Sequence, residues 1–186
     1  QLLPYECDGL TLHGAVPSAV VLPRDTDEIA RLVRACRRFG VPFVPRGAGT
    51  GLSGGAVAME GGVVIECSRL DRVLHVDVAD RFAVVQPGVV NAALSKRVQP
   101  HGLFYAPDPS SQLACTIGGN VGENSGGPHT LKYGTTTNHV LAVQLVLPDG
   151  EVVRLGSATG TPNGPDLLGA VVGSEGTLGI VSEVTV

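Results

Sequence analysis

Tryptophan is absent from this chain of 186 residues, and the other aromatic side chains are few, with three Tyr and four Phe. The sequence also has no run of basic residues, and its formal net charge is −4. Nucleic-acid-binding surfaces cluster their cations, and single strands stack on aromatic rings. The composition therefore argues against a protein that binds nucleic acid.

Closely spaced cysteines and long apolar runs are absent as well. The four cysteines, at positions 7, 36, 67 and 115, are too far apart for zinc or iron–sulfur motifs, and His13, His75 and His139 share no ligand spacing. We therefore expect no metal site. No apolar run reaches the roughly 18 residues of a membrane helix, and no signal peptide is visible. These features predict a cytoplasmic protein with reduced thiols.

Glycine, in contrast, is abundant, with 26 residues, and five of them fall in the stretch 45–55. Apolar runs typical of strands precede this stretch at 41–44 and follow it at 62–66. Glycine permits positive φ, and successive N–H groups in such a loop can hold an anion. Because the loop is longer than a turn requires, we expect it to bind phosphate, with Arg46, Thr50 and Ser53 adding a cation and two hydroxyls.

Two common phosphate-binding motifs do not explain this loop. Gly49–Gly54 matches the letters G-x-G-x-x-G, but a dinucleotide-binding fingerprint needs a helix after the loop, and the residues that follow favour a strand. A Walker loop needs Lys and then Ser or Thr after its last glycine, and neither follows here.

The first part of the chain predicts a strand–helix–strand unit with parallel pairing. An apolar run at 19–22 is typical of a strand, and Asp25 with Glu28 fits a capping box for the helix that follows. Its apolar face carries residues 29, 32, 33 and 36, and Gly40 is placed as the C-cap. The glycine-rich loop then follows the second strand, where ligands bind in open α/β sheets.

The second part predicts mainly antiparallel strands, with a weak boundary near 68–72. Strands are expected at 73–78, 82–86, 140–147, 152–153 and 178–186, and the turn Pro148-Asp149-Gly150 favours a hairpin. Asn91 is expected to cap a short helix that ends at Val98.

Five segments in this order resemble the vanillyl-alcohol-oxidase type of FAD-binding domain, and within it the glycolate oxidase, D-lactate dehydrogenase and D-2-hydroxyglutarate dehydrogenase flavoproteins. They are Arg46–Gly55, Tyr105–Gln112, Thr116–Asn120, Lys132–Gly134 and Gly173–Gly179. The resemblance implies an α+β, PCMH-type fold with FAD between two subdomains. These are a small parallel α/β part at about 1–72 and a larger antiparallel part at about 73–186.

The resemblance also assigns residues to FAD. Around the pyrophosphate it places Arg46, Gly47, Ala48, Gly49, Thr50, Gly51, Ser53 and Gly54. Along the ribityl chain, the isoalloxazine ring and the flavin side of the cleft it places Pro107, Asp108, Ser111, Thr116, Gly119, Asn120, Asn124, Gly127 and Tyr133. Around the adenosine and ribityl portions it places Glu175, Gly176 and Ile180. Some relatives tether the flavin through a His at about the position of Thr50, so we expect non-covalent FAD here.

The activity that the resemblance implies is oxidation of a small 2-hydroxy acid, glycolate to glyoxylate first of all, by hydride transfer to flavin N5. D-lactate or D-2-hydroxyglutarate oxidation is the alternative. The reductase of cell-wall precursor synthesis is disfavoured by Tyr105–Gln112, and a nucleotide-binding module without a redox role stays open. The resemblance further implies a C-terminal substrate domain absent from this chain, an iron–sulfur electron-transfer partner and membrane association through partner subunits.

No residue of the chain is assigned to catalysis. His129 is a weak candidate for a base, since it lies in a loop between Gly127 and Lys132 and has no partner evident in the sequence. We therefore expect this chain alone to be inactive, even with FAD.

Overall fold

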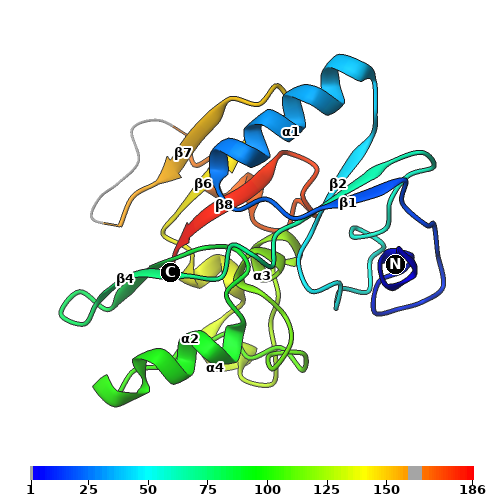
Figure 1. Ribbon diagram of the computed structural model, residues 1–186. Helices are drawn as coiled ribbons and strands as arrows, with labels where there is room; N and C mark the ends of the chain where they lie inside the picture. The colour runs from blue at the N-terminus through cyan, green and yellow to red at the C-terminus, as the bar shows by residue number, and fades with distance from the viewer. Residues whose placement is uncertain (1, 159–164) are drawn as a thin grey trace.

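The computed structural model describes residues 2–158 and 165–186, and within them the strands form two sheets (Figure 1). The smaller sheet is parallel and has the order β1-β3-β2, with β1 at Ala19–Val21, β2 at Phe43–Arg46 and β3 at Val63–Glu66. β1 and β2 therefore do not pair with each other, because β3 lies between them. Val64 and Ile65 of β3 are fully buried, as expected for a central strand.

The larger sheet is antiparallel and has the order β4-β5-β8-β6-β7. Its strands are β4 Val73–Asp77, β5 Phe82–Val85, β6 Ala142–Val146, β7 Val152–Gly156 and β8 Ile180–Thr185. The expected α+β fold, with a small parallel part and a larger antiparallel part, is confirmed.

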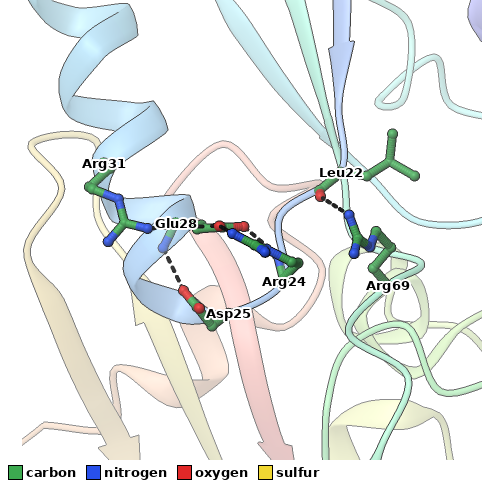
Figure 2. Close-up of polar contacts among 6 residues, drawn as sticks. All are labelled: Leu22, Arg24, Asp25, Glu28, Arg31 and Arg69. Atoms are coloured by element: carbon green, nitrogen blue, oxygen red, sulfur yellow. Dashed lines mark hydrogen bonds and ion pairs between the residues drawn. The ribbon is translucent and has the colours of Figure 1, made fainter.

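Helix α1, Thr26–Phe39, begins and ends at the residues that the sequence predicts. The Asp25 carboxylate accepts a hydrogen bond from Glu28 N at 2.7 Å, and Gly40 closes the helix with a φ of 64°. The other half of the capping box is wrong. The Glu28 carboxylate accepts from Arg24 N at 2.7 Å instead of from the N-cap amide (Figure 2).

Arg24 also donates from its guanidinium to Glu28 Oε1, with Nε at 3.0 Å, and this hydrogen bond lowers the Glu28 pKa to about 2. We expect Arg24→Ala to raise that pKa part of the way toward the ordinary 4.5, as measured by NMR titration of the carboxyl. Because the folded-state pKa is depressed, the contribution to stability is present above the ordinary pKa and is lost as the pH falls through about 2.

Arg31→Ala is the matched control for this titration, since its guanidinium lies 3.9 Å from the same Glu28 oxygen without a hydrogen bond (Figure 2). A much smaller shift is expected there. An unchanged Glu28 pKa in Arg24→Ala would show that the contact has no electrostatic effect.

Helix α1 packs against both sheets. Its Ile29, Ala30 and Val33 belong to one buried cluster that also contains Ile65 of the smaller sheet and Val146 and Ile180 of the larger sheet. Figure 1 shows α1 lying across β6 and β8. Arg34 adds a hydrogen bond from its guanidinium to the Gly150 carbonyl in the β6–β7 turn, at 2.8 Å.

The second core lies between the larger sheet and the helices α2, Asn91–Val98, and α3, Ile117–Glu123. Its largest fully buried side chains include Leu94, Ile117 and Leu145. Short helices complete the described chain: η1 Leu3–Tyr5, η2 Gln99–His101, α4 Thr130–Tyr133, η3 Thr136–His139 and α5 Leu168–Val171.

Asn91 does not cap α2, contrary to the expectation. The N-cap is Val90, and Asn91 is the first helical residue, with its side chain fully buried. Its Nδ2 donates to the Pro107 carbonyl at 2.9 Å, so the amide holds a distant segment instead of the helix end.

The four cysteines are free thiols. Among the described residues, no helix combines the length and the apolar character needed to cross a membrane, and no three His, Cys, Asp or Glu side chains are grouped as a metal site would require.

Candidate functional site

A cavity of about 310 Å³ lies between the two sheets, where the glycine-rich loop leaves the carboxyl end of β2. The loop forms one side, the start of α3 forms another, and Ser174–Gly176 with the first residues of β8 close it. Its volume is in the range of small-molecule sites, at the lower end. The cavity therefore joins segments that are far apart in the chain.

The glycine-rich loop, whose residues 47–52 line this cavity, has a run of unpaired backbone donors in the described structure. Across the part of the chain that the structure describes, the N–H groups of residues 47–53 have no hydrogen-bond acceptor. Gly49 has a φ of 68° and Gly54 a φ of 83°, the left-handed conformation that glycine adopts most easily. A run of free N–H groups with such turns can hold an anion.

Arg46 stands at the start of this loop with its side chain buried. Its Nη1 donates to the Ala56 carbonyl at 3.1 Å, and its Cζ lies 5.5 Å from the centre of the Tyr5 ring. A side chain at position 49 would meet the Arg46 guanidinium, because the Cβ built on Gly49 falls 2.6 Å from Cζ. Arg46 thus lines the cavity and also connects the start of the loop to the residue that follows it, Ala56.

Helix α3 brings two polar side chains to the cavity. Thr116 is its N-cap and accepts from Gly119 N at 3.4 Å, while Ile117 and Val121 pack into the second core. This register places Asn120 at the cavity wall with a relative exposure of 1%. Both of its amide atoms are buried and make no hydrogen bond of normal geometry among the described residues. Its polar neighbour is the Cys115 thiol, whose pKa is raised by burial and partly lowered again by Ser111 and Asn120. Such unsatisfied groups are rare and point to an unfilled bonding role.

The cavity unites thirteen of the twenty residues assigned to FAD. They are Arg46, Gly47, Ala48, Gly49, Thr50, Gly51, Ser111, Thr116, Gly119, Asn120, Glu175, Gly176 and Ile180. The sequence motifs at 46–55, 116–120 and 173–179 therefore meet at one place, with Ser111 from the segment 105–112.

The other seven do not line the cavity, and most of them have partners elsewhere in the described chain. Ser53 Oγ lies 3.0 and 2.9 Å from the two Glu123 carboxylate oxygens, and Asn124 Oδ1 accepts from the N and Oγ1 of Thr137. The remaining ones are Gly54, Pro107, Asp108, Gly127 and Tyr133. Gly54 N donates to Asp8, and the Pro107 carbonyl accepts from Asn91.

His129 has a partner, which the sequence did not reveal. Its Nδ1 lies 2.5 Å from Asp108 Oδ2, and this hydrogen bond lowers the Asp108 pKa below its ordinary value. The Tyr133 ring lies 6.4 Å away, and that ring in turn packs edge-on against Phe104. The pair connects two predicted cofactor segments, yet both His129 and Asp108 lie outside the cavity lining.

Several lining residues were missed from the sequence, among them Asp8, Glu123 and Ser125. Glu123 and Ser125 are the sequence neighbours of Asn124, which is predicted to bind the cofactor, and this adjacency could have identified them. No feature of the sequence indicates Asp8, because it precedes the loop by more than thirty-five residues and belongs to no recognised motif.

Comparisons with known proteins identify a family and several relatives. A family model described as an FAD binding domain matches residues 17–156. The glycolate oxidase subunit GlcD of Escherichia coli K12 is 50% identical over 186 residues, which are 100% of this chain and 37% of that protein. The D-lactate dehydrogenase of Anaerostipes hadrus is 41% identical over 180 residues, 96% of this chain and 38% of that protein.

A solved structure of alkyldihydroxyacetonephosphate synthase superimposes with a TM-score of 0.77 at 30% identity, covering 89% of this chain and 33% of the synthase. The chain thus spans little more than a third of the length of the relatives it matches.

Proposed function

Because this chain belongs to the family of FAD-binding domains, we propose that its cavity holds FAD and that it is the flavin-binding part of an oxidoreductase acting on a small 2-hydroxy acid. The family membership rests on a match over residues 17–156, and the relatives at 41–50% identity include glycolate oxidase subunits and a D-lactate dehydrogenase.

One observation supports the proposed position of the cofactor. Residues 47–52 line a cavity that also contains Asn120, and within the described structure neither their N–H groups nor the Asn120 amide makes a hydrogen bond. Six free donors suit a pyrophosphate, which has oxygen acceptors only, and an amide suits a flavin or ribityl group with both donors and acceptors. The residues present therefore fit FAD, with the glycine-rich loop on the pyrophosphate.

The remaining assignments follow from which residues share the cavity. We propose that Ser111, Thr116 and Asn120 lie along the ribityl chain and flavin, and that Glu175, Gly176 and Ile180 complete the adenosine side. Bound FAD supplies the acceptor for a hydride from the substrate α-carbon. The protein orients it and excludes water.

For the substrate, we favour glycolate, with D-lactate and D-2-hydroxyglutarate as alternatives, because the relatives named glycolate oxidase subunit GlcD have the higher identities, 50% and 45%. His129 stays our candidate for the base, and its Asp108 partner would fix the imidazole orientation. An iron–sulfur partner subunit and a cytoplasmic location stay predictions.

The expected attachment of FAD is non-covalent, because Thr50 stands where a tethering His would be. We expect acid precipitation of FAD-loaded protein to leave a colourless pellet and a yellow supernatant, as read by visible absorption. A yellow pellet would contradict this prediction. A chain that never takes up flavin, but retains an uncoloured nucleotide, would instead favour the non-redox nucleotide-binding module.

The activity is tested by dye reduction with glycolate, D-lactate and D-2-hydroxyglutarate. The test compares the 186-residue chain with an intact protein that also has the expected C-terminal substrate domain. Acid–base catalysis alone typically contributes about 10²–10⁴ in rate. Lys132 lies over the Tyr133 ring, which is itself next to His129, and we assign no described residue to a substrate carboxylate. We therefore expect turnover only in the intact protein. Turnover above about 1 per second by the chain alone would contradict this and favour His129 as a sufficient base.

A further inference from the structure

The N-terminal segment Tyr5–Gly9 contacts the glycine-rich loop at three points. Asp8 Oδ2 accepts from Gly54 N at 2.7 Å, Gly9 N donates to the Gly51 carbonyl at 2.9 Å, and the Tyr5 ring lies under the Arg46 guanidinium. Asp8 is buried, with a relative exposure of 6%. The segment precedes residues 17–156, which the family model matches, so nothing in that match assigns it a role.

These contacts are spread along the whole loop. Arg46 is its first residue, Gly51 its middle and Gly54 lies near its end. The segment bonds to the Gly51 carbonyl and to the Gly54 amide, and in the described structure it leaves the N–H groups of residues 47–53 unpaired. It therefore restrains the loop without occupying the N–H groups of residues 47–52, which line the cavity.

Hydrogen bonds to neighbouring residues hold the segment itself in place. Asp8 Oδ1 accepts from Leu10 N at 2.9 Å, and the Ala15 amide donates to the Glu6 carbonyl at 2.7 Å. Burial raises the pKa of Asp8. The backbone hydrogen bonds, from Leu10 and Gly54 among others, together lower the pKa by more than burial raises it, so the pKa lies below its ordinary value. The carboxylate is thus a stable charged acceptor for the loop amide.

We propose that Tyr5–Gly9 is a clasp that keeps the glycine-rich loop in the shape that binds the FAD pyrophosphate, with Asp8 as its positioning residue. The inference rests on the proposed function. A loop with five glycines has many conformations, and ordering it on binding would lower the affinity. A loop that is held in advance avoids that loss, which is the general effect of preorganisation.

The test is FAD affinity in Asp8→Asn, measured by quenching of flavin fluorescence. Asparagine has the size of aspartate and keeps one oxygen for Leu10 N, but its NH₂ group cannot accept from Gly54 N. Removing a charge-assisted hydrogen bond is expected to raise the FAD Kd about tenfold and to speed hydrogen exchange of the Gly54 amide. A purely structural role would lower the unfolding temperature and leave the Kd of the folded protein unchanged.

Asp149→Asn is the matched control. The Asp149 Oδ1 accepts from Glu151 N at 2.9 Å, in the same i to i+2 pattern as Asp8 and Leu10, but it belongs to the β6–β7 hairpin and makes no hydrogen bond to the glycine-rich loop within the described structure. Its Kd for FAD should equal that of the unmodified chain.

Gly9→Ala is a second, independent variant. A Cβ there would lie 2.9 Å from the Thr50 carbonyl oxygen and would push the segment off the loop, so the same rise in Kd is expected. If the unmodified chain binds FAD and both variants bind it equally well, the clasp is refuted and the proposed function stands. If the unmodified chain binds no FAD, both fail.

Discussion

Gly49→Val is expected to weaken FAD binding by about a hundredfold, on the order of 3 kcal/mol. Two effects combine at this residue. Its φ of 68° is unfavourable for a β-branched side chain, by about 1–3 kcal/mol. The new Cβ would also collide with the Arg46 guanidinium, which holds the Ala56 carbonyl. Displacing Arg46 would change the shape of the loop and close the approach to its N–H groups.

Gly61→Val separates the two effects. Gly61 has a similar φ of 75°, but no atom lies within 4 Å of the Cβ that would be added, and the residue does not line the cavity. We expect a loss of stability of about 1–3 kcal/mol from backbone strain with unchanged FAD affinity. Flavin titration and thermal unfolding of both variants check this. Equal affinities for Gly49→Val and the unmodified chain would remove the glycine-rich loop from the site.

Asn120→Leu is expected to have effects of opposite sign on stability and binding. Each buried polar group without a partner costs about 1–3 kcal/mol, and both amide atoms of Asn120 are in that position within the described structure. A leucine of similar size should therefore raise the unfolding temperature of the protein without FAD. It should also lower FAD affinity at least about tenfold, because the polar groups of the ligand lose their partner.

The control is Asn91→Leu, another fully buried asparagine. Its Oδ1 also lacks a partner in the described structure, but its Nδ2 donates to the Pro107 carbonyl. Its removal leaves that carbonyl unpaired and should therefore give less stabilisation than Asn120→Leu, or a net loss. The measurement is thermal unfolding with and without FAD, and the gap between the two midpoints should shrink in Asn120→Leu. A variant at position 120 that is less stable without FAD and binds it normally would make Asn120 a structural residue.

The sequence predicts the elements that depend on local signals. Asp25 and Gly40 cap α1 as expected, and the parallel and antiparallel parts separate where the strand patterns change. The glycine-rich loop was identified from composition alone. Four of the five motifs used for the resemblance contribute to the cavity, the segment 105–112 through Ser111 alone. The other three place glycines and small polar residues next to the start or end of a strand or helix.

Long-range polar contacts could not be predicted in this way. Asp8 and Gly54 are 46 residues apart, and Asp108 and His129 are 21 apart, so no periodicity or spacing relates them. Asn91 has the sequence of a helix cap, but the Pro107 carbonyl is the stronger partner in the folded chain. The division into subdomains at about 1–72 and 73–186 stays a prediction.

The position of α1 has a consequence for how a ligand enters the cavity. One buried cluster joins α1 to Ile65 of the smaller sheet and to Val146 and Ile180 of the larger sheet, so rotating one sheet against the other would break a close-packed interior. Ile180 belongs to this cluster and to the cavity wall at once. We therefore expect the smaller and the larger sheet to keep their relative position when a ligand enters the cavity between them. Association with FAD should therefore follow a single kinetic phase, without the slower phase of a domain closure.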